Sequence, residues 1–260
     1  MRILVTGATS EFGSKLMEYF SNRSDFTFVP SHSTVPYFRL EDEMPSDYCV
    51  GYQAIIHLAF ARSPKINQTL KEINKLGTSR LLEQAINSKV KHFILISSDS
   101  ASENALSTYG QTKYEAETIV LSSDIGTVLR VGLIGGASPL GPFQKILKLA
   151  ETLKFLPLPR PDFPNFTLTS IEEVGAVLLK VLNSLPVGGP FAVSGIKRAV
   201  TLREAISFSL KTSVLIVPLP IGLGLTSLVF KTAKLLKINL PLSQDSVTAI
   251  FVKREIISFL

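Results

Sequence analysis

The chain has few of the residue types that build metal or disulfide sites. Its 260 residues include one cysteine, Cys49, three histidines and no tryptophan. A single cysteine excludes an internal disulfide framework and a cysteine-based zinc site, and it fits a reducing compartment. Three scattered histidines disfavour a histidine metal site as well. We therefore expect no metal cofactor.

Charged residues are also scarce, at 18% of the chain, whereas 45% of the residues are hydrophobic and the mean hydropathy is +0.29. A chain of this composition can bury a sizeable core, so intrinsic disorder is excluded as its main state. The length suits one large α/β domain, with or without a small appendage.

Signals for secretion or membrane insertion are weak. Met1 and Arg2 lead directly into a short apolar strand rather than a signal-peptide core, and we expect a cytoplasmic protein. The uncharged stretch 213–230 approaches the length of a membrane span, but two prolines and two glycines interrupt it. We predict a strand, a proline-rich loop and a helix starting near Gly222 instead.

The net charge of +6 is unevenly distributed. Residues 126–260 carry 15 Lys and Arg against 7 Asp and Glu, a net of +8, whereas residues 1–125 carry 12 against 14, a net of −2. The basic half is expected to meet an anion, and solvated surface is the alternative. Because the basic residues are interspersed with apolar ones, a small phosphorylated ligand is favoured over nucleic acid or an acidic membrane surface.

The N-terminal half alternates between apolar strands and amphipathic helices. We predict strands over 3–5, 26–29, 54–59 and 92–96, and helices over 12–20, 70–87 and 109–120. Continuous apolar strands joined by helices indicate a parallel sheet covered on both faces. The expected fold is α/β, a Rossmann-type doubly wound sheet with a smaller C-terminal substrate-binding subdomain.

The residue composition changes near Ile134, where Gly, Pro and Leu become frequent. Such a composition is typical of a loop-rich part that closes over a ligand. We assign residues 1–133, with 165–182 returning, to the Rossmann-type domain. Residues 134–164 and 183–260 form the smaller subdomain. Capping boxes at Thr108–Gln111 and Thr201–Glu204 mark two helix starts.

A glycine-containing turn follows the first strand and reads TGATSEFG over residues 6–13. Its glycines, Gly7 and Gly13, let the backbone approach a pyrophosphate, which the amino end of the next helix faces. Ser10 stands where a middle glycine is usual and adds a Cβ and a hydroxyl near the phosphates. A purely structural turn is the alternative.

Tyr109 and Lys113 lie four residues apart, so they project from one face of the predicted helix, after the strand-end residues Ser97 and Ser98. A free tyrosine has a pKa near 10, so proton transfer at neutral pH requires that its phenolate be stabilised by roughly 3 to 4 kcal/mol. The positive charges of a lysine and of the cofactor can supply this stabilisation. Ser98 would bond the substrate oxygen, Tyr109 would exchange its proton, and a nicotinamide would exchange hydride.

Taken in order, these motifs resemble the extended short-chain dehydrogenase/reductases, in particular the NAD-dependent epimerase/dehydratase group that acts on nucleotide sugars. The matching segments are TGATSEFG, His57-Leu58-Ala59, the helix motif from Asn74 to Leu82, the YGQTK stretch and FTLTSIEEVG. The resemblance covers about residues 1–205.

The resemblance implies a catalytic set of Ser98, Tyr109 and Lys113, and NAD or NADP as cofactor. The residues expected to bind the cofactor, the catalytic tyrosine and lysine included, are Gly7, Thr9, Ser10, Glu11, Phe12, Gly13, Ser31, His32, Arg39, Leu40, Leu58, Ala59, Phe60, Asn74, Ile96, Ser97, Tyr109, Lys113 and Val131. A nucleotide-diphosphate sugar is the implied substrate, and helices 70–87 and 109–120 imply a homodimer.

Candidate substrate residues are Ser98, Asp99 and Ser100, with Gln144, Arg160 and Arg198 added for charge or placement. Sugar 4,6-dehydratases of this family typically carry Thr-Asp-Glu where this chain has Ser98-Asp99-Ser100. Because Ser100 cannot act as the base, a dehydratase is disfavoured. We expect a C4 epimerase, with a 4-keto-sugar reductase or an idle dinucleotide-binding protein as alternatives.

Cofactor choice stays open at this stage. Relatives that use NAD place a carboxylate after the second strand, where this chain reads Val29-Pro30-Ser31-His32-Ser33. Nothing there repels a 2′-phosphate, so NADP is admitted. Arg39 is a candidate for contact with that phosphate, and an exposed surface arginine is the alternative.

Overall fold

The computed structural model describes residues 1–31, 37–61, 69–159, 162, 164–210, 213–219 and 258–259. Six strands form the central sheet in the order β10-β5-β4-β3-β1-β2, and all five pairings are parallel. The strands are β1 (Ile3–Thr6), β2 (Phe26–Val29), β3 (Ala54–His57), β4 (His92–Ser98), β5 (Gly126–Val131) and β10 (Gly188–Val193).

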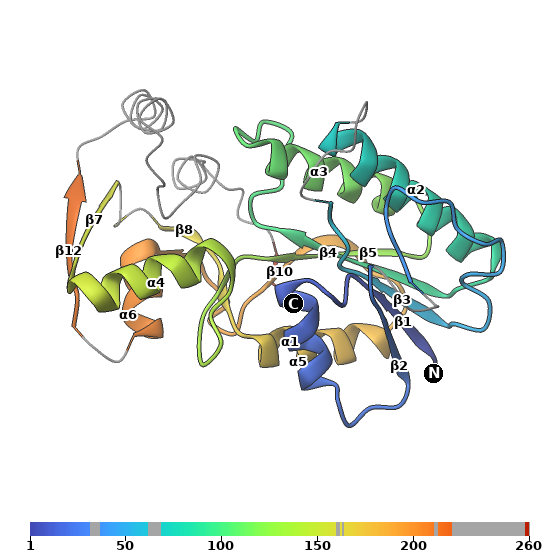
Figure 1. Cartoon of the computed structure of the whole chain (residues 1–260), viewed down its shortest axis with the longest axis horizontal. Helices are drawn as coiled ribbons and strands as arrows, with labels where there is room; N and C mark the ends of the chain where they lie inside the picture. The colour runs from blue at the N-terminus through green and yellow to red at the C-terminus, as the bar shows by residue number, and fades with distance from the viewer. Residues whose placement is uncertain are drawn as a thin grey trace.

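Helices cover both faces of this sheet (Figure 1). Helices α1 (Glu11–Tyr19) and α5 (Ile171–Leu182) lie on one face, and α2 (Leu70–Asn87) and α3 (Thr108–Leu121) lie on the other. Two buried clusters follow, one containing Leu16 and Val174, the other Leu81 and Val120. The predicted doubly wound Rossmann-type fold is confirmed.

The sheet changes its direction of winding between β1 and β3. The strand order places β2 on one side of β1, whereas β3 and all later strands lie on the other side. Ligands of open α/β sheets bind at such a switch point, outside the carboxyl ends of the strands. Gly7 directly follows β1 and Leu58 directly follows β3, so both lie at this position.

A smaller part with its own core extends from one end of the sheet (Figure 1). Its core contains Phe143, Leu156 and Ile206. It comprises α4 (Gly141–Leu153), β7 (Phe155–Pro159), β8 (Pro164–Phe166), β11 (Val200–Thr201), α6 (Leu202–Ser209) and β12 (Leu215–Leu219). Strands β6 (Leu133–Ile134) and β9 (Leu168–Thr169) form a short parallel pair, and in the chain β6 lies between β5 and α4 and β9 between β8 and α5.

The sequence and the structure differ over residues 188–193, which we expected in the smaller part. They form β10 and pair with β5 of the main sheet. Val193 is fully buried in the same core as Leu16, so burial of its apolar side chain accounts for the placement. How the two parts divide as independent units stays a prediction.

Helix starts and the uncharged stretch were predicted in part. The cap of α3 is Ser107 rather than Thr108, because Ser107 has extended backbone and its hydroxyl accepts from the amide of Gly110. The capping box at Thr201 and Glu204 is confirmed. Strand β12 confirms the strand predicted in the uncharged stretch, whereas the helix predicted from Gly222 lies outside the described residues.

None of the helices in the described part of the chain has both the length and the apolar character needed to cross a bilayer.

Candidate active site

Gly7 brings the turn after β1 into direct contact with the chain that leaves β3. Its φ of +82° is in the region that favours glycine, and a Cβ at this position would lie 2.6 Å from the amide nitrogen of Ala59. Both the backbone conformation and the lack of space therefore exclude a side chain at position 7. Gly7, Leu58 and Ala59, all expected at a cofactor, meet at the switch point of the sheet.

The hydroxyl of Ser10 turns back onto the turn that contains it. Ser10 is the N-cap of α1, and its Oγ accepts from the amide of Gly13 at 2.9 Å and donates to the carbonyl of Gly7 at 2.8 Å. Its φ of −71° suits any residue, so serine replaces the usual glycine without backbone strain. Ser10 therefore holds the turn together, and its contact with a phosphate stays a prediction.

Two further contacts connect this turn to its surroundings. The Thr9 hydroxyl lies 2.9 Å from that of Ser31, just after β2. The exposed Glu11 carboxylate accepts from the amide of Gly141, the first residue of α4, at 3.3 Å. Glu11 thus places a negative charge at the start of α1, where the resemblance implies a bound pyrophosphate. Its hydrogen bond to Gly141 also links the start of α1 to the smaller part.

Asn74 fixes the chain that follows β3. It is buried on α2, and its side-chain amide accepts from the amide of Ala61 at 2.9 Å and donates to the carbonyls of Ala61 and Leu70 at 3.1 and 2.7 Å. These three hydrogen bonds use most of the donors and acceptors of the Asn74 side chain. Asn74 therefore fixes the backbone at Ala61, after β3, against α2.

His57 lies buried below the same segment and stays neutral. Its Nδ1 is 2.7 Å from the Thr6 hydroxyl and its Nε2 is 3.2 Å from the Thr78 hydroxyl. Burial lowers the pKa of His57 to about 3, and the nearby charge of Lys113 acts in the same direction. At neutral pH, His57 thus adds no second cation beside Lys113.

Tyr109, Lys113 and Phe60 form a cluster at the carboxyl end of the sheet. The Phe60 and Tyr109 rings meet edge to face with centroids 4.9 Å apart, and the Lys113 Nζ lies 5.0 Å from the Phe60 centroid. Lys113 is buried and donates to the carbonyl of Ile96 at 2.9 Å, whereas Tyr109 is 39% exposed. The structure therefore brings together four of the predicted cofactor residues.

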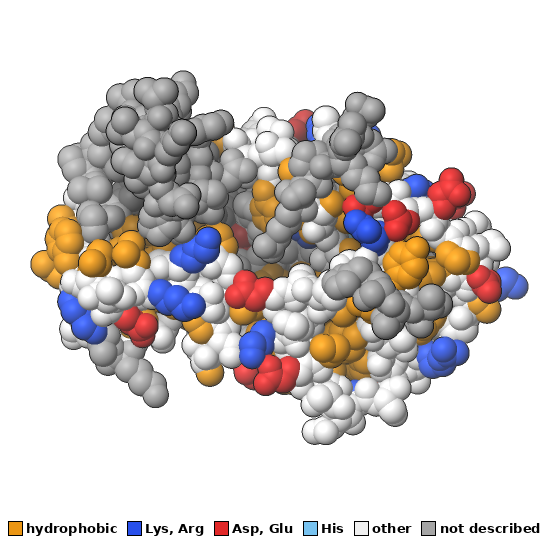
Figure 2. All heavy atoms as spheres, in the orientation of Figure 1, with side chains coloured by type: hydrophobic (Ala, Val, Ile, Leu, Met, Phe, Trp, Pro, Cys, Tyr) orange, Lys and Arg blue, Asp and Glu red, His pale blue; other side chains and the backbone are white. Residues whose placement is uncertain are grey.

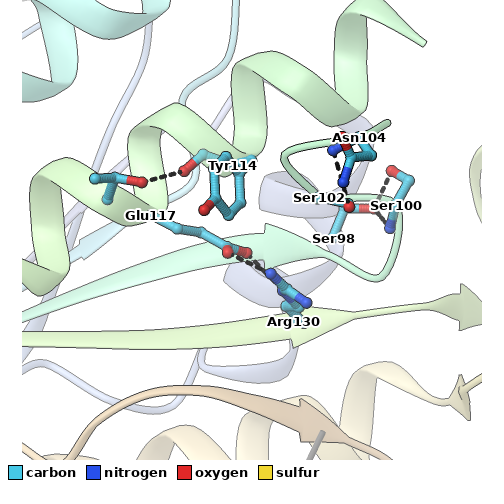
Figure 3. A network of polar contacts seen from close by, with 8 residues as sticks. Ser98, Ser100, Ser102, Asn104, Tyr114, Glu117 and Arg130 are labelled. Carbon is cyan, nitrogen blue, oxygen red and sulfur yellow. Dashed lines mark hydrogen bonds and ion pairs between the residues drawn. The ribbon is translucent and has the colours of Figure 1, made fainter. Parts of the chain in front are cut away.

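The start of α3 packs directly onto the end of the segment that carries Ser98. A Cβ on Gly110 would lie 2.3 Å from the carbonyl oxygen of Ser100, so the two backbones touch. The Ser98 and Ser100 hydroxyls are 2.9 Å apart, and the amide of Ser100 donates to Ser98 Oγ at 3.2 Å (Figure 3). Ser98 and Tyr109 thus come from segments in direct contact.

The carboxylate of Asp99 bonds to the protein itself. Its Oδ2 accepts from the amide of Thr167 at 2.9 Å and from the Thr167 hydroxyl at 2.5 Å. The amide of Asp99 donates to the carbonyl of Val131 at 3.3 Å. Asp99 therefore connects the end of β4 to the chain between β8 and β9.

One buried ion pair below the site was not predicted. Arg130 of β5 donates two hydrogen bonds to the carboxylate of Glu117 on α3, at 2.8 and 2.6 Å (Figure 3). Both side chains are almost fully buried. Glu117 lies four residues after Lys113, so the same helical spacing that singled out Tyr109 and Lys113 could have pointed to it.

Several of the other predicted residues have no described contact with this cluster, and two lie outside the described residues. Arg198 pairs with Glu204 at 2.9 Å on the surface, Arg39 pairs with Glu41 at 3.5 Å, and Gln144 lies on α4. Leu40 and Val131 are buried in the cores. His32 and Arg160 lie outside the described residues. Among the residues that are described, no group of His, Cys, Asp and Glu could hold a metal ion.

The profile of one family, described as "Polysaccharide biosynthesis protein", matches residues 41–128. This stretch runs from before β3 into β5 and includes α2, Ser98, Tyr109 and Lys113. No curated protein sequence matches the chain.

Solved structures share the fold over most of the chain. MoeE5 in complex with UDP-glucuronic acid and NAD is 20% identical with a TM-score of 0.64, covering 84% of this chain and 85% of that chain. A hypothetical dTDP-4-dehydrorhamnose reductase from Sulfolobus tokodaii is 20% identical with a TM-score of 0.64, covering 85% and 88%. The dTDP-glucose 4,6-dehydratase from Bacillus anthracis is 17% identical with a TM-score of 0.61, covering 84% of each chain.

The profile match over residues 41–128 and the fold shared with these structures agree with the resemblance to the extended short-chain dehydrogenase/reductases.

Proposed function

We propose that this chain is an NAD(P)-dependent enzyme that transfers hydride at a carbon of a nucleotide-diphosphate sugar. One observation carries the proposal. The backbone of Ala59 touches Gly7 in the glycine turn, and the ring of the next residue, Phe60, touches both Tyr109 and Lys113. A dinucleotide lying across residues 59 and 60 would span the distance from the turn to the proton-transfer pair.

The residues present fit a dinucleotide. Gly7 permits close approach to the backbone, and the amides of Glu11 and Phe12, in the first turn of α1, have no partner within the helix. Of the described residues directly after β2, Pro30 and Ser31, neither carries a charge, which is compatible with NAD or NADP. When bound, the nicotinamide supplies or accepts the hydride.

Proton transfer is assigned to the side chains around Tyr109. The phenol exchanges its proton with the substrate oxygen, and the Lys113 ammonium, one helical turn further on, stabilises the phenolate. Ser98 donates a hydrogen bond to the same substrate oxygen. Because His57 is neutral, it adds no second positive charge beside Lys113.

A dehydratase is not supported, because Ser100 offers a hydroxyl, bonded to Ser98, where elimination of water needs a carboxylate base. Two reactions remain. A C4 epimerase returns the hydride to the same carbon and keeps its cofactor, whereas a 4-keto-sugar reductase exchanges cofactor in every cycle. The charge of Glu11 beside the pyrophosphate site weakens cofactor binding, and this observation favours the reductase as the second candidate.

The test is to identify the nucleotide that co-purifies with the full chain by mass spectrometry, together with thermal shifts in NAD, NADP, NADPH and UDP. A ligand at a hundred times its dissociation constant stabilises by about 2.7 kcal/mol, which is measurable. Tightly held NAD supports the epimerase, and an empty protein stabilised by NADPH supports the reductase. A protein that responds to no dinucleotide overturns the proposal.

We also propose a homodimer through α2 and α3, the helices implied by the resemblance, since the two helices pack side by side on one face of the sheet (Figure 1). Sedimentation equilibrium of the full chain tests this point, and a monomer at all concentrations contradicts it.

A further inference from the structure

The corner where α4 ends and β7 begins exposes apolar side chains beside lysines. The residues of this α4–β7 corner are Leu153, Phe155 and Leu215, with Lys145, Lys148 and Lys154 beside them. The three apolar side chains are 53%, 43% and 63% exposed.

Backbone contacts place the apolar residues side by side. Strands β7 and β12 are parallel with Phe155 opposite Leu215, and the amide of Leu215 donates to the carbonyl of Lys154 at 3.0 Å. Their sequence neighbours, Leu156 and Ile216, point into the core of the smaller part. Because side chains alternate along a strand, Phe155 and Leu215 face away from that core together.

Three lysines lie on α4 or directly after it. Lys145 and Lys148 lie on the exposed face of α4, opposite the buried Ile146 and Leu147, and Lys154 caps the helix with a φ of +57°. One exposed carboxylate, Glu151, lies on the same face. Figure 2 shows Lys or Arg side chains near the hydrophobic ones at this end of the molecule.

We propose that the α4–β7 corner docks on the surface of an anionic lipid bilayer, independently of the hydride-transfer site. Exposed Leu and Phe side chains enter the interface between headgroups and acyl chains, and lysines next to them pair with anionic headgroups. A second copy of the chain fits this corner less well, since a two-fold contact would bring lysines against lysines.

The experiment is flotation of the full chain with vesicles of phosphatidylcholine alone, or with about one-third phosphatidylglycerol, at low and high salt. Binding is expected to the anionic vesicles at low salt, with loss of binding at high salt. Lys145→Gln combined with Lys148→Gln should lower the partition coefficient at least about tenfold, since each lysine contributes about fivefold. Phe155→Ser should lower it as well.

Matched controls use exposed residues elsewhere. Leu185→Ser, at a position 83% exposed after α5, and Lys91→Gln, at an exposed position before β4, should bind like the original chain. Equal binding to neutral and anionic vesicles, no binding, or an equal loss in the controls overturns the proposal. Self-association that Phe155→Ser abolishes, without vesicle binding, also overturns it and assigns the corner to a protein contact.

Discussion

Asp99 and Thr167 are joined through a single carboxylate oxygen, which accepts from both the amide and the hydroxyl of the threonine. The two residues are 68 positions apart in the chain. Asp99 directly follows the proposed catalytic Ser98, and Thr167 directly precedes β9. This contact therefore sets how the end of β4 is held against the chain that leads to the smaller part.

We predict that Asp99→Asn lowers the free energy of unfolding by about 1 to 3 kcal/mol, because hydrogen bonds to a charged group are stronger than neutral ones. Thr167→Val removes the hydroxyl donor but keeps the amide. Urea unfolding of both variants and of the double variant should give a coupling energy of about 1 kcal/mol. Asp47→Asn, at an exposed position, is the control. Additive effects would contradict the contact.

The ion pair of Glu117 and Arg130 makes a different prediction. Glu117→Gln leaves the buried Arg130 guanidinium without its carboxylate, and the expected loss of stability is about 3 to 5 kcal/mol. Replacing both, Glu117→Leu with Arg130→Met, should recover most of that loss, because no uncompensated charge remains buried. Urea unfolding measures both. A single variant as stable as the original chain would contradict this account.

These two pairs mark the limit of prediction from the sequence. Strand β2 and helix α2 have the bounds that their apolar patterns predict. Burial of one face of an element spaces its apolar residues at regular intervals in the sequence, so such elements can be recognised. The partner of Asp99 could not be predicted, because pattern carries no information on contacts 68 residues apart. Glu117, by contrast, could have been found from helical spacing alone.

Polar side chains were the least predictable part of the candidate site. Ser10 was expected near phosphates, yet its hydroxyl caps its own helix, which depends on the backbone angles of the turn. Arg198 was chosen for its charge, and its pairing with Glu204 could not be read from the sequence. Strand β10 was missed because a Gly-Gly-Pro start resembles a loop, although the apolar residues that follow are buried.

Two buried histidines predict a loss of stability in mild acid. Burial lowers the pKa of His57 to about 3 and that of His92 to about 4, from an ordinary value of 6.5. The unfolded chain therefore takes up protons that the folded chain excludes, so the stabilisation is complete above pH 6.5 and is lost as the pH falls below it. At pH 5 the loss is about 2 kcal/mol for each histidine.

Urea unfolding at pH 7 and pH 5 checks this prediction. His92→Gln removes one titrating group and can still bond to Thr127, the partner of His92. The variant should therefore lose about half as much stability between the two pH values as the original chain. An unchanged pH dependence would show that His92 is not the group responsible.

Glu11 predicts how tightly a dinucleotide is held. Glu11→Gln keeps an acceptor for the amide of Gly141 but removes the negative charge at the start of α1. The dissociation constant of NADPH should fall about two- to fivefold, corresponding to the 0.3 to 1 kcal/mol of a charge at a helix terminus. Fluorescence titration measures it. Glu18→Gln, on the last turn of the same helix, is the control, and an equal or weaker affinity in Glu11→Gln would contradict the argument.

Tyr109 separates an enzyme from a protein that only binds a dinucleotide. Tyr109→Phe keeps the ring that packs against Phe60 and removes the proton that the reaction exchanges. Turnover should fall at least about a hundredfold, the usual contribution of general acid–base catalysis. The dissociation constant of the dinucleotide should stay within about threefold, a change below 1 kcal/mol.

The matched control is Tyr114→Phe, since Tyr114 is on the same helix and its described hydrogen bond is made by its backbone carbonyl, which accepts from Thr118 (Figure 3). Turnover should be unchanged in that variant. Loss of turnover in both variants would point to a structural effect on α3 rather than to proton transfer. Full turnover in Tyr109→Phe would remove Tyr109 from the reaction, and Lys113, which acts through the phenol, would lose its assigned role with it.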